Sequence, residues 1–395
     1  MPVPMIPSSA LQSLTTLQSG MGWFPQQAGG LNRMYHNLVR TLPALGVRVH
    51  GLVAGTGSVS ELAGGTVTPF ASPDAPLMSR WWAARREAKR VLRDVEPALV
   101  ASHFALYSAS WLDLIGDRPF VVHFHGPWAA EGAVEKAPSP VTRLKHYIER
   151  RVYARADRLI VLSDAFGQIL QNAYDIPGDR IVRIPGGVDA AAFAPNASPM
   201  EARIRLDWPL NRPIVLAVRR LAPRMGLETL IDAMADVRRD VPDVLLLVAG
   251  TGPLDSSLIH RIRERGLAQH VRLLGFIPDA DLPYAYRAAT LSVVPTVALE
   301  GFGLITIESL AAGTPVLVTP VGGLPEVVAP LSDELVCTGT NRHDLADGLR
   351  RALLVPEVLP RTDACQSYVR THFDWPLITR QIRDVYDDAL RLAAR

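Results

Sequence analysis

Cysteine is almost absent from this sequence. Only Cys337 and Cys365 occur among 395 residues, which excludes a disulfide scaffold and a zinc site built on cysteines and favours a reducing compartment such as the cytosol. An excess of either charge is also absent, because 41 basic and 39 acidic side chains leave a net charge of +2. This balance excludes a strongly basic nucleic-acid binder and an acidic disordered chain.

Long apolar runs are missing as well. The first charged residue is Arg33, yet prolines, glutamines and glycines interrupt the stretch before it. A transmembrane helix needs about 20 mainly apolar residues, and a signal peptide needs a basic segment before a compact apolar run. Neither pattern occurs, so we expect a soluble, cytoplasmic protein without a membrane span.

What the sequence does contain is an alternation of short apolar runs with longer helical patterns. Its apolar fraction of 48% is typical of globular proteins, and its length indicates two or three domains. Strands are expected at 11–18, 47–53, 98–102, 119–124, 158–162, 181–184, 213–218, 244–249, 271–274, 291–294 and 315–318. Helices are expected near 30–44, 79–94, 140–155, 226–239, 254–266, 304–312, 342–354 and 376–394.

Near-continuous apolar strands separated by helices are typical of parallel sheets covered on both faces. Two such series predict two doubly wound α/β domains. The stretch 189–199 is rich in small residues and proline, so we divide the chain into domains at 1–195 and 196–375. No strand follows the last helix, 376–395, which can therefore pack back on the first domain.

The loop 295–303 is the richest candidate for chemistry. It follows a predicted strand, contains Glu300, Gly301 and Gly303, and leads into a helix that carries Glu308. Glycines allow close backbone approach, and the amides at a helix N-terminus attract phosphate. Carboxylates beside such a site suit sugar or ribose hydroxyls. On spacing alone, a solvated glutamate and an ordinary glycine explain the loop equally well.

The spacing Glu300-x7-Glu308 around Gly-Phe-Gly, with Gly322-Gly323-Leu-Pro-Glu326 after it, resembles retaining GT-B glycosyltransferases of family 4, the glycogen synthase- and sucrose synthase-like group 1 enzymes. Other motifs of the family follow in its order along nearly the whole chain, namely Pro25-x3-Gly29-Gly30, His123-Phe-His125-Gly126, Ile184-Pro-Gly-Gly187-Val188-Asp189 and Val248-Ala-Gly250-Thr-Gly252-Pro253. Each motif is weak alone. The resemblance implies the GT-B fold, in which two Rossmann-like domains face a cleft.

The resemblance also implies a donor site on the second domain. There Glu308 would hold the ribose hydroxyls and Glu300 would contact the donor sugar. Base contacts would lie near Phe276 and Ile277. The diphosphate would be cradled by the backbone amides of Gly303, Leu304 and Ile305.

From the first, acceptor-binding domain the resemblance implies further contacts. The amides of Gly29 and Gly30 would approach the same phosphates after domain closure, and His125 would lie beside the transferred sugar. Without the family, a histidine satisfied at a strand end is the better explanation of His125. No cluster of His, Asp or Glu has obvious metal spacing, and the family implies transfer without a metal or a prosthetic group.

The positive charges depart from the family pattern. The family has an Arg-Leu pair followed by Lys-Gly; Arg220 matches the arginine, but the lysine position holds Met225. Arg224, one residue earlier, can supply the charge, because its fork suits a diphosphate. The opposite hypothesis is a solvated Arg224 in a catalytically weak nucleotide-sugar-binding partner.

On the acceptor side, residues 79–93 form a predicted helix with Trp81 and Trp82 at its start and six basic side chains against one acidic. Such a helix can lie on an anionic membrane, although a solvated amphipathic face explains it as well. A second basic segment contains Arg143, Lys145, Arg150, Arg151, Arg155 and Arg158. A lipid-linked acceptor therefore stays among the alternatives.

Together these features predict a retaining hexosyltransferase. It would move a hexose-type sugar from a UDP- or GDP-sugar to the hydroxyl of a glycan, lipid-linked or small-molecule acceptor, in glycan, polysaccharide or glycoconjugate biosynthesis. Retention, and front-face transfer in which the leaving phosphate takes the acceptor proton, follow from the resemblance alone. The rival hypotheses are the inactive binding partner and a GT-B-shaped sugar-nucleotide epimerase. No nucleic-acid partner is expected.

Overall fold

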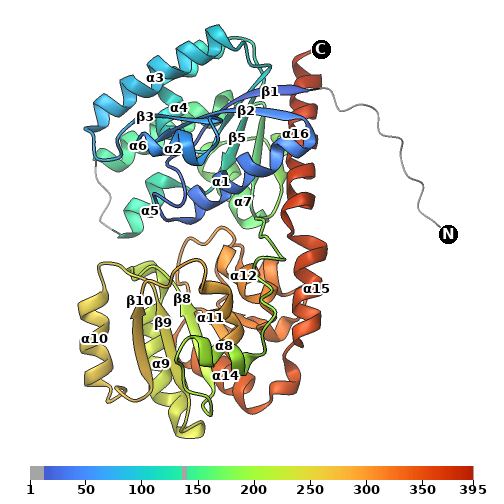
Figure 1. The fold of residues 1–395 in the computed structure, drawn as a ribbon. Coiled ribbons are helices and arrows are strands. Elements are labelled where there is room, and N and C mark those ends of the chain that lie inside the picture. Colours follow the sequence, from blue (N-terminus) through green and yellow to red (C-terminus); the bar gives the residue numbers. More distant parts are fainter. Residues whose placement is uncertain (1–12, 136–139, 395) are drawn as a thin grey trace, which may run out of the picture.

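The computed structural model describes residues 13–135 and 140–394 of the chain, in two α/β domains that lie one above the other (Figure 1). Each domain has one parallel sheet, of seven strands in the first and five in the second. Helices cover both faces of each sheet, as the buried strand sequences require. The predicted fold of two doubly wound domains is confirmed.

The first sheet has the order β3-β2-β1-β4-β5-β6-β7. Its strands are β1 (Leu14–Ser19), β2 (Val47–Ala54), β3 (Val67–Ala71), β4 (Leu99–Ser102), β5 (Phe120–Phe124), β6 (Arg158–Val161) and β7 (Ile181–Arg183). The helices around it are α1 (Gly30–Thr41), α2 (Ser58–Leu62), α3 (Leu77–Asp94), α4 (Ala105–Ser108), α5 (Trp128–Glu135), α6 (Pro140–Arg155) and α7 (Asp164–Tyr174).

The second sheet has the order β10-β9-β8-β11-β12. Its strands are β8 (Ile214–Val218), β9 (Leu245–Ala249), β10 (Val271–Gly275), β11 (Leu291–Val294) and β12 (Val316–Val318). The helices that follow the first domain are α8 (Pro199–Arg205), α9 (Leu227–Asp240), α10 (Asp255–Glu264), α11 (Leu282–Ala288), α12 (Leu304–Ala311), α13 (Leu324–Val328), α14 (Arg342–Leu354), α15 (Thr362–His372) and α16 (Trp375–Ala393).

The central strands are buried along their whole length, which explains their unbroken apolar sequences. All five residues of β5 and of β9 are buried. In the second domain one core packs α9 and α14 against β8 and β9, and another packs α8 and α11 on the opposite face of the same strands. Parallel strands sandwiched in this way carry apolar side chains on both faces.

The strand predictions agree with the structure to within a residue or two at most ends, with one strand missed. The strand predicted at 11–18 begins at Leu14, and its first two residues lie outside the described part of the chain, as does residue 395 of the last predicted helix. Strand β3 escaped prediction because Pro69 and neighbouring threonines break the apolar pattern. It lies at the edge of the sheet, where proline is tolerated.

The last helix belongs to the end of the chain but packs on the first domain. Its residues Ile378 and Tyr386 are completely buried in a core that also contains Leu38 and Val121. Figure 1 shows α16, in red, running along the side of the first sheet's domain. The two connections between the domains lie side by side, because the N–H of Val188 donates to Phe373 O at 2.9 Å and that of Trp375 to Val188 O at 3.2 Å.

Candidate active site

Each sheet has a topological switch point, where the chain leaves neighbouring strands in opposite directions. In the first sheet it lies between β1 and β4, and in the second between β8 and β11. Ligands of open parallel sheets bind beyond the carboxyl ends of the strands at such points. The predicted site residues follow β1, β5, β8 and β11, apart from Phe276 and Ile277 after β10, so the fold gathers most of their loops between the two domains.

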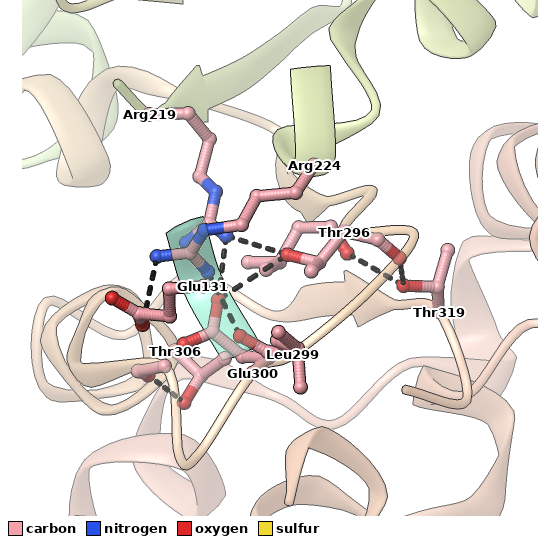
Figure 2. Close-up of polar contacts among 10 residues, drawn as sticks. Glu131, Arg219, Arg224, Thr296, Leu299, Glu300, Thr306 and Thr319 are labelled. Atoms are coloured by element: carbon pink, nitrogen blue, oxygen red, sulfur yellow. Dashed lines mark hydrogen bonds and ion pairs between the residues drawn. The ribbon is translucent and has the colours of Figure 1, made fainter. Parts of the chain in front are cut away.

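Glu300 forms an ion pair with Arg219. Nη2 of Arg219 lies 2.6 Å from Oε2 of Glu300, and the two side chains are only 8% and 15% exposed. The Thr296 hydroxyl contacts both groups, and the Thr319 hydroxyl donates to the carbonyl of Thr296 (Figure 2). The sequence prediction chose Arg220, which is exposed. Arg219 was missed because the two arginines follow β8 consecutively and the family motif matches the second.

Arg224 lies beside the same loop. Its Nη1 donates to the carbonyl oxygen of Leu299 at 2.8 Å, and its Nη2 is 3.3 Å from the carboxylate of Glu131, which α5 brings from the first domain. Leu299 has a φ of 51°, a left-handed conformation that is strained for leucine. Arg224 therefore holds the backbone that presents Glu300 and links this loop to Glu131 of the first domain (Figure 2).

Met225, at the family's lysine position, has no part in this charged group. Its side chain is buried in the core with Leu221, Ala222 and Leu227. The neighbouring residue Arg224 differs from Met225, because its charged side chain points toward the Glu300 loop. The positive charge beside the Glu300 loop thus comes from Arg224 and not from position 225.

Glu308 is buried on α12. It is 5% exposed, and it accepts a hydrogen bond of 3.1 Å from the Tyr286 hydroxyl. Burial raises the pKa of Glu308 above its ordinary value, while the positive charge of Arg33 and the Tyr286 hydrogen bond oppose the rise. Arg33 comes from α1 of the first domain and also pairs with Asp279 after β10. Glu308 thus lies where the two domains meet.

The N-terminus of α12 offers backbone amides. The N–H groups of Gly303, Leu304 and Ile305 donate no hydrogen bond to the part of the chain described here. Gly303 has a φ of 75°, and a Cβ there would lie 2.7 Å from a Leu324 methyl, so glycine is required. Gly30 faces this turn from the first domain, its Cβ position 3.7 Å from the Leu304 side chain. Together with Gly29 before it, this loop opposes the helix that the sequence assigned to phosphate.

His125 belongs to a histidine cluster at the end of β5. Its Nε2 is 3.2 Å from Nδ1 of His103, whose ring stacks on that of His123 at 4.1 Å. Burial lowers the pKa of His125 to about 4, and burial together with the neighbouring histidines holds the pKa of His103 well below its usual range. His103 follows β4 and was missed, because nothing in the sequence shows that β4 and β5 are neighbours.

Phe276 and Ile277 lie further from this centre. They follow β10, and Phe276 is exposed while Ile277 packs partly on the core of α8 and α11. The Phe276 ring is thus accessible near Asp279, the partner of Arg33. The contact with the donor base predicted for Phe276 and Ile277 stays a prediction.

The first and second domains also contact one another at α7. The Glu326 carboxylate, on α13, accepts hydrogen bonds from the amides of Asp164 at 2.7 Å and Ala165 at 2.9 Å. A carboxylate at a helix N-terminus satisfies unpaired amides and complements the helix dipole. These two bonds join α13 to the first domain on the same side as the Glu300 loop, since Gly323 donates to Glu300 O at 2.9 Å.

In residues 13–135 and 140–394, no three His, Cys, Asp or Glu side chains are grouped to hold a metal ion. Among the helices of the same residues, none is both long and apolar enough to cross a bilayer.

Family models match both domains. The model of glycosyl transferases group 1 matches residues 200–370, and the model of Glycosyltransferase Family 4 matches residues 28–192. A D-inositol 3-phosphate glycosyltransferase of Frankia alni is 31% identical over 93% of this chain and 96% of that protein. The protein of the same name from Corynebacterium glutamicum is 32% identical over 65% of this chain, and the match spans 63% of that relative's length.

Solved structures share the fold. Sucrose-phosphate synthase from Thermosynechococcus elongatus has a TM-score of 0.78 and 24% identity, over 97% of this chain and all of that one. Anabaena HepE, solved in complex with UDP-glucose, has a TM-score of 0.77 and 21% identity, over 95% of this chain and all of that one. These likenesses extend over both domains and the loops between them.

Proposed function

This chain belongs to the group 1 glycosyltransferases of family 4, enzymes that transfer a sugar from a nucleotide-sugar donor, and we propose that it moves a hexose-type sugar from a UDP- or GDP-sugar with retention at the anomeric carbon. The observation that carries the proposal is the convergence at one place of Glu300, its arginines and the amides of α12. His125 and Gly30 face this place from the other domain.

On the donor side, the Glu308 carboxylate accepts hydrogen bonds from the ribose hydroxyls. Its burial and its position on α12 support this role, because a buried carboxylate needs partners and the Tyr286 hydroxyl supplies one. The base lies near Phe276 and Ile277, where an exposed ring can stack on it. The diphosphate takes the amides of residues 303–305, approached by Gly29 and Gly30. UDP is the favoured nucleotide, because HepE was solved with UDP-glucose.

The leaving diphosphate acquires negative charge, which preorganised cations stabilise. After Lys145 the sequence contains no lysine, so the second domain has only arginine for a permanent cation. Arg224 and Arg219 lie against the loop of Glu300, and Arg220 follows on the same segment. We assign the charge of the missing lysine to Arg224, with Arg219 and Arg220 as further diphosphate contacts.

Glu300 orients the donor sugar. Its ion pair with Arg219 fixes the position of its carboxylate, which suits hydrogen bonding to sugar hydroxyls. The departing phosphate oxygen takes the proton of the acceptor hydroxyl on the front face, so the step needs no separate carboxylate base. The chemistry requires no metal, and we expect turnover to persist in EDTA.

The acceptor is a hydroxyl of a glycan, a lipid-linked sugar or a small molecule. D-inositol 3-phosphate enters the test first, because relatives of this chain are named for it. The two cysteines are buried free thiols, consistent with a role in the cytoplasm, where sugar nucleotides are available.

Peripheral membrane contact through 79–93 forms part of the proposal. Trp82 on α3 is 61% exposed next to exposed Met78, whereas Trp81 packs partly on the core. One tryptophan rather than two can therefore enter an interface. Co-sedimentation with vesicles containing anionic lipid at low salt tests this contact. Binding that Trp82→Ala weakens supports it, and no binding at low salt refutes it.

The decisive test is a panel of UDP- and GDP-sugars with several acceptors, D-inositol 3-phosphate among them. Release of nucleotide diphosphate, together with a glycoside that has the same anomeric configuration as the donor, supports a retaining transferase. NMR of the anomeric proton shows whether that configuration is axial or equatorial. Inversion refutes retention. Donor binding without release favours the inactive partner suggested by Met225, and conversion of the donor without release favours the epimerase.

A further inference from the structure

We propose that Thr16, Gln18 and His103 form a buried relay that fixes the tautomer of His125, so that its ring carries a proton on Nε2 and presents Nδ1 as a hydrogen-bond acceptor. The inference rests on the proposed function only for its consequence, that Nδ1 accepts from a hydroxyl of the donor sugar. The tautomer itself can be tested without any substrate.

Three neighbouring strands bring the relay together. Thr16 and Gln18 lie on β1, His103 follows β4, and His125 follows β5. In the sheet, Gln18 pairs with Ala101 of β4, and Ser102 of β4 pairs with Val122 of β5. Residues two apart on one strand share a face. The side chains of Thr16, Gln18 and His103 are all buried, so their hydrogen bonds are not exchanged with bulk water.

The direction of the relay is set at its inner end by a backbone carbonyl. The Thr16 hydroxyl donates to the carbonyl oxygen of Arg48 at 3.3 Å, an atom that only accepts. With its proton committed there, Thr16 Oγ1 accepts from the amide NH₂ of Gln18 at 3.2 Å. This fixes which way the Gln18 amide faces.

The opposite atom of that amide, Gln18 Oε1, lies 3.3 Å from Nε2 of His103. Because Oε1 only accepts, His103 must carry its proton on Nε2. Burial and the neighbouring histidines hold the pKa of His103 well below its usual range, so the ring is neutral and its Nδ1 has a lone pair. The bond of 3.2 Å to His125 is then donated by His125 Nε2–H.

His125 is neutral for the same reason, since burial lowers its pKa to about 4. A neutral imidazole with its proton on Nε2 has an unprotonated Nδ1. No hydrogen bond to that nitrogen occurs within residues 13–135 and 140–394, so it remains available to a ligand. A reversed relay would place a donor there instead, and would favour a carboxylate over a hydroxyl.

His123 stacks on His103 but lies outside the relay. Its Nε2 is bonded at 2.9 Å to the Tyr386 hydroxyl from α16. Two tyrosine hydroxyls also lie close to the relay: that of Tyr35 donates to the backbone oxygen of Gln18, and that of Tyr386 contacts the Gln18 side chain as well as His123. Replacement of His123 therefore disturbs the same buried cluster without removing any hydrogen-bonding group of the relay, and supplies a matched control.

The first experiment measures the tautomer of His125 directly. The full chain, labelled with ¹⁵N-histidine, is examined by long-range ¹H–¹⁵N correlation at pH 7.5 without ligand, and the His125→Gln spectrum assigns the ring. A proton on Nε2 with an unprotonated Nδ1 supports the relay. A proton on Nδ1, or on both nitrogens, overturns it, whatever the enzyme's substrate proves to be.

The second experiment breaks the relay by side-chain replacement. Gln18→Met keeps the size and removes the acceptor, whereas His103→Gln keeps a donor toward Gln18 and an acceptor toward His125. With the donor that the panel identifies, we expect Gln18→Met to lower kcat/KM about 10- to 100-fold, as for an unpaired buried polar group. UDP binding should be unchanged, because UDP lacks the sugar.

The controls separate positioning from structure. His103→Gln should recover most of the activity that His103→Leu loses, and His123→Phe should leave the His125 tautomer as it is in the wild-type chain. Equal activity of Gln18→Met and wild type, or an unchanged His125 tautomer in Gln18→Met, refutes the relay. Loss of UDP binding in Gln18→Met would show a structural role instead.

Discussion

The replacement Arg224→Ala tests whether this chain has moved the cation of its family by one residue. The Arg224 side chain is 11% exposed and bonds both Leu299 O and the Glu131 carboxylate across the domains. Alanine removes one positive charge beside Glu300 and leaves the buried Met225 unable to replace it. We expect the main loss in the rate of sugar transfer.

The size of the effect follows from the geometry. A hydrogen bond to a charged group contributes about 1.5–3 kcal/mol, and removal of one preorganised donor at a developing charge lowers kcat about 100- to 1000-fold. Since Arg219 remains near the same place, we expect the lower end, about 100-fold in kcat. The Michaelis constant for the donor should rise less, because the diphosphate gains charge only as the bond breaks.

The assay is release of nucleotide diphosphate with the preferred donor, together with thermal unfolding of each variant. Arg224→Lys keeps the charge without the fork and should lose about tenfold. Arg261→Ala is the matched control, because Arg261 pairs with Asp232 at 2.7 Å on the α9 and α10 side of the second domain. Turnover of Arg224→Ala near that of wild type would refute the displaced cation.

Three further predictions concern the buried groups. Glu308→Gln should raise the donor KM about tenfold with a smaller change in kcat, because the weaker acceptor binds the ribose hydroxyls in both the ground state and the transition state. Titration calorimetry with UDP measures the affinity, and an unchanged affinity contradicts the prediction. Arg33→Ala, which removes the cross-domain pair with Asp279, should weaken donor binding severalfold while the same change at Arg205, which pairs with Asp281 on one domain, should not. The unfolding free energy should fall as the pH drops from about 6.5 toward 4. Over that window the unfolded chain binds more protons than the folded one, because burial lowers the pKa of His125 to about 4. Urea unfolding midpoints that stay constant between these pH values contradict the prediction.

Much of the fold followed from the sequence because its strands are apolar on both faces. Short apolar runs such as 120–124 are typical of buried parallel strands, and the structure has a strand there. Strand β3 was missed because an edge strand is held by its neighbour β2 rather than by its own pattern. Pro69 in β3 lowers the local β-strand propensity on which a prediction from sequence depends.

The family motifs predicted the site residues that lie on one segment of the chain. They did not predict the residues that several segments bring together. Glu300 and Glu308 lie on one continuous stretch, so their proximity was foreseeable. Arg219 was missed because the backbone direction at the end of β8 decides which of two adjacent arginines meets Glu300. Gln18 and His103 were missed because their contact depends on the order of β1, β4 and β5 in the sheet.

The position of α16 determines the order in which the protein can be completed during synthesis. The first domain leaves the ribosome first, but Ile378 and Tyr386 fill its core and Tyr386 bonds His123. Until the last residues emerge, that core lies open and the histidine cluster lacks its outer partner. The second domain has its core complete at Phe373 and needs no part of α16. The domain that is made first is therefore completed only when α16 emerges, and a ribosome that stalls before α16 leaves the loops of both domains present but the histidine cluster without Tyr386.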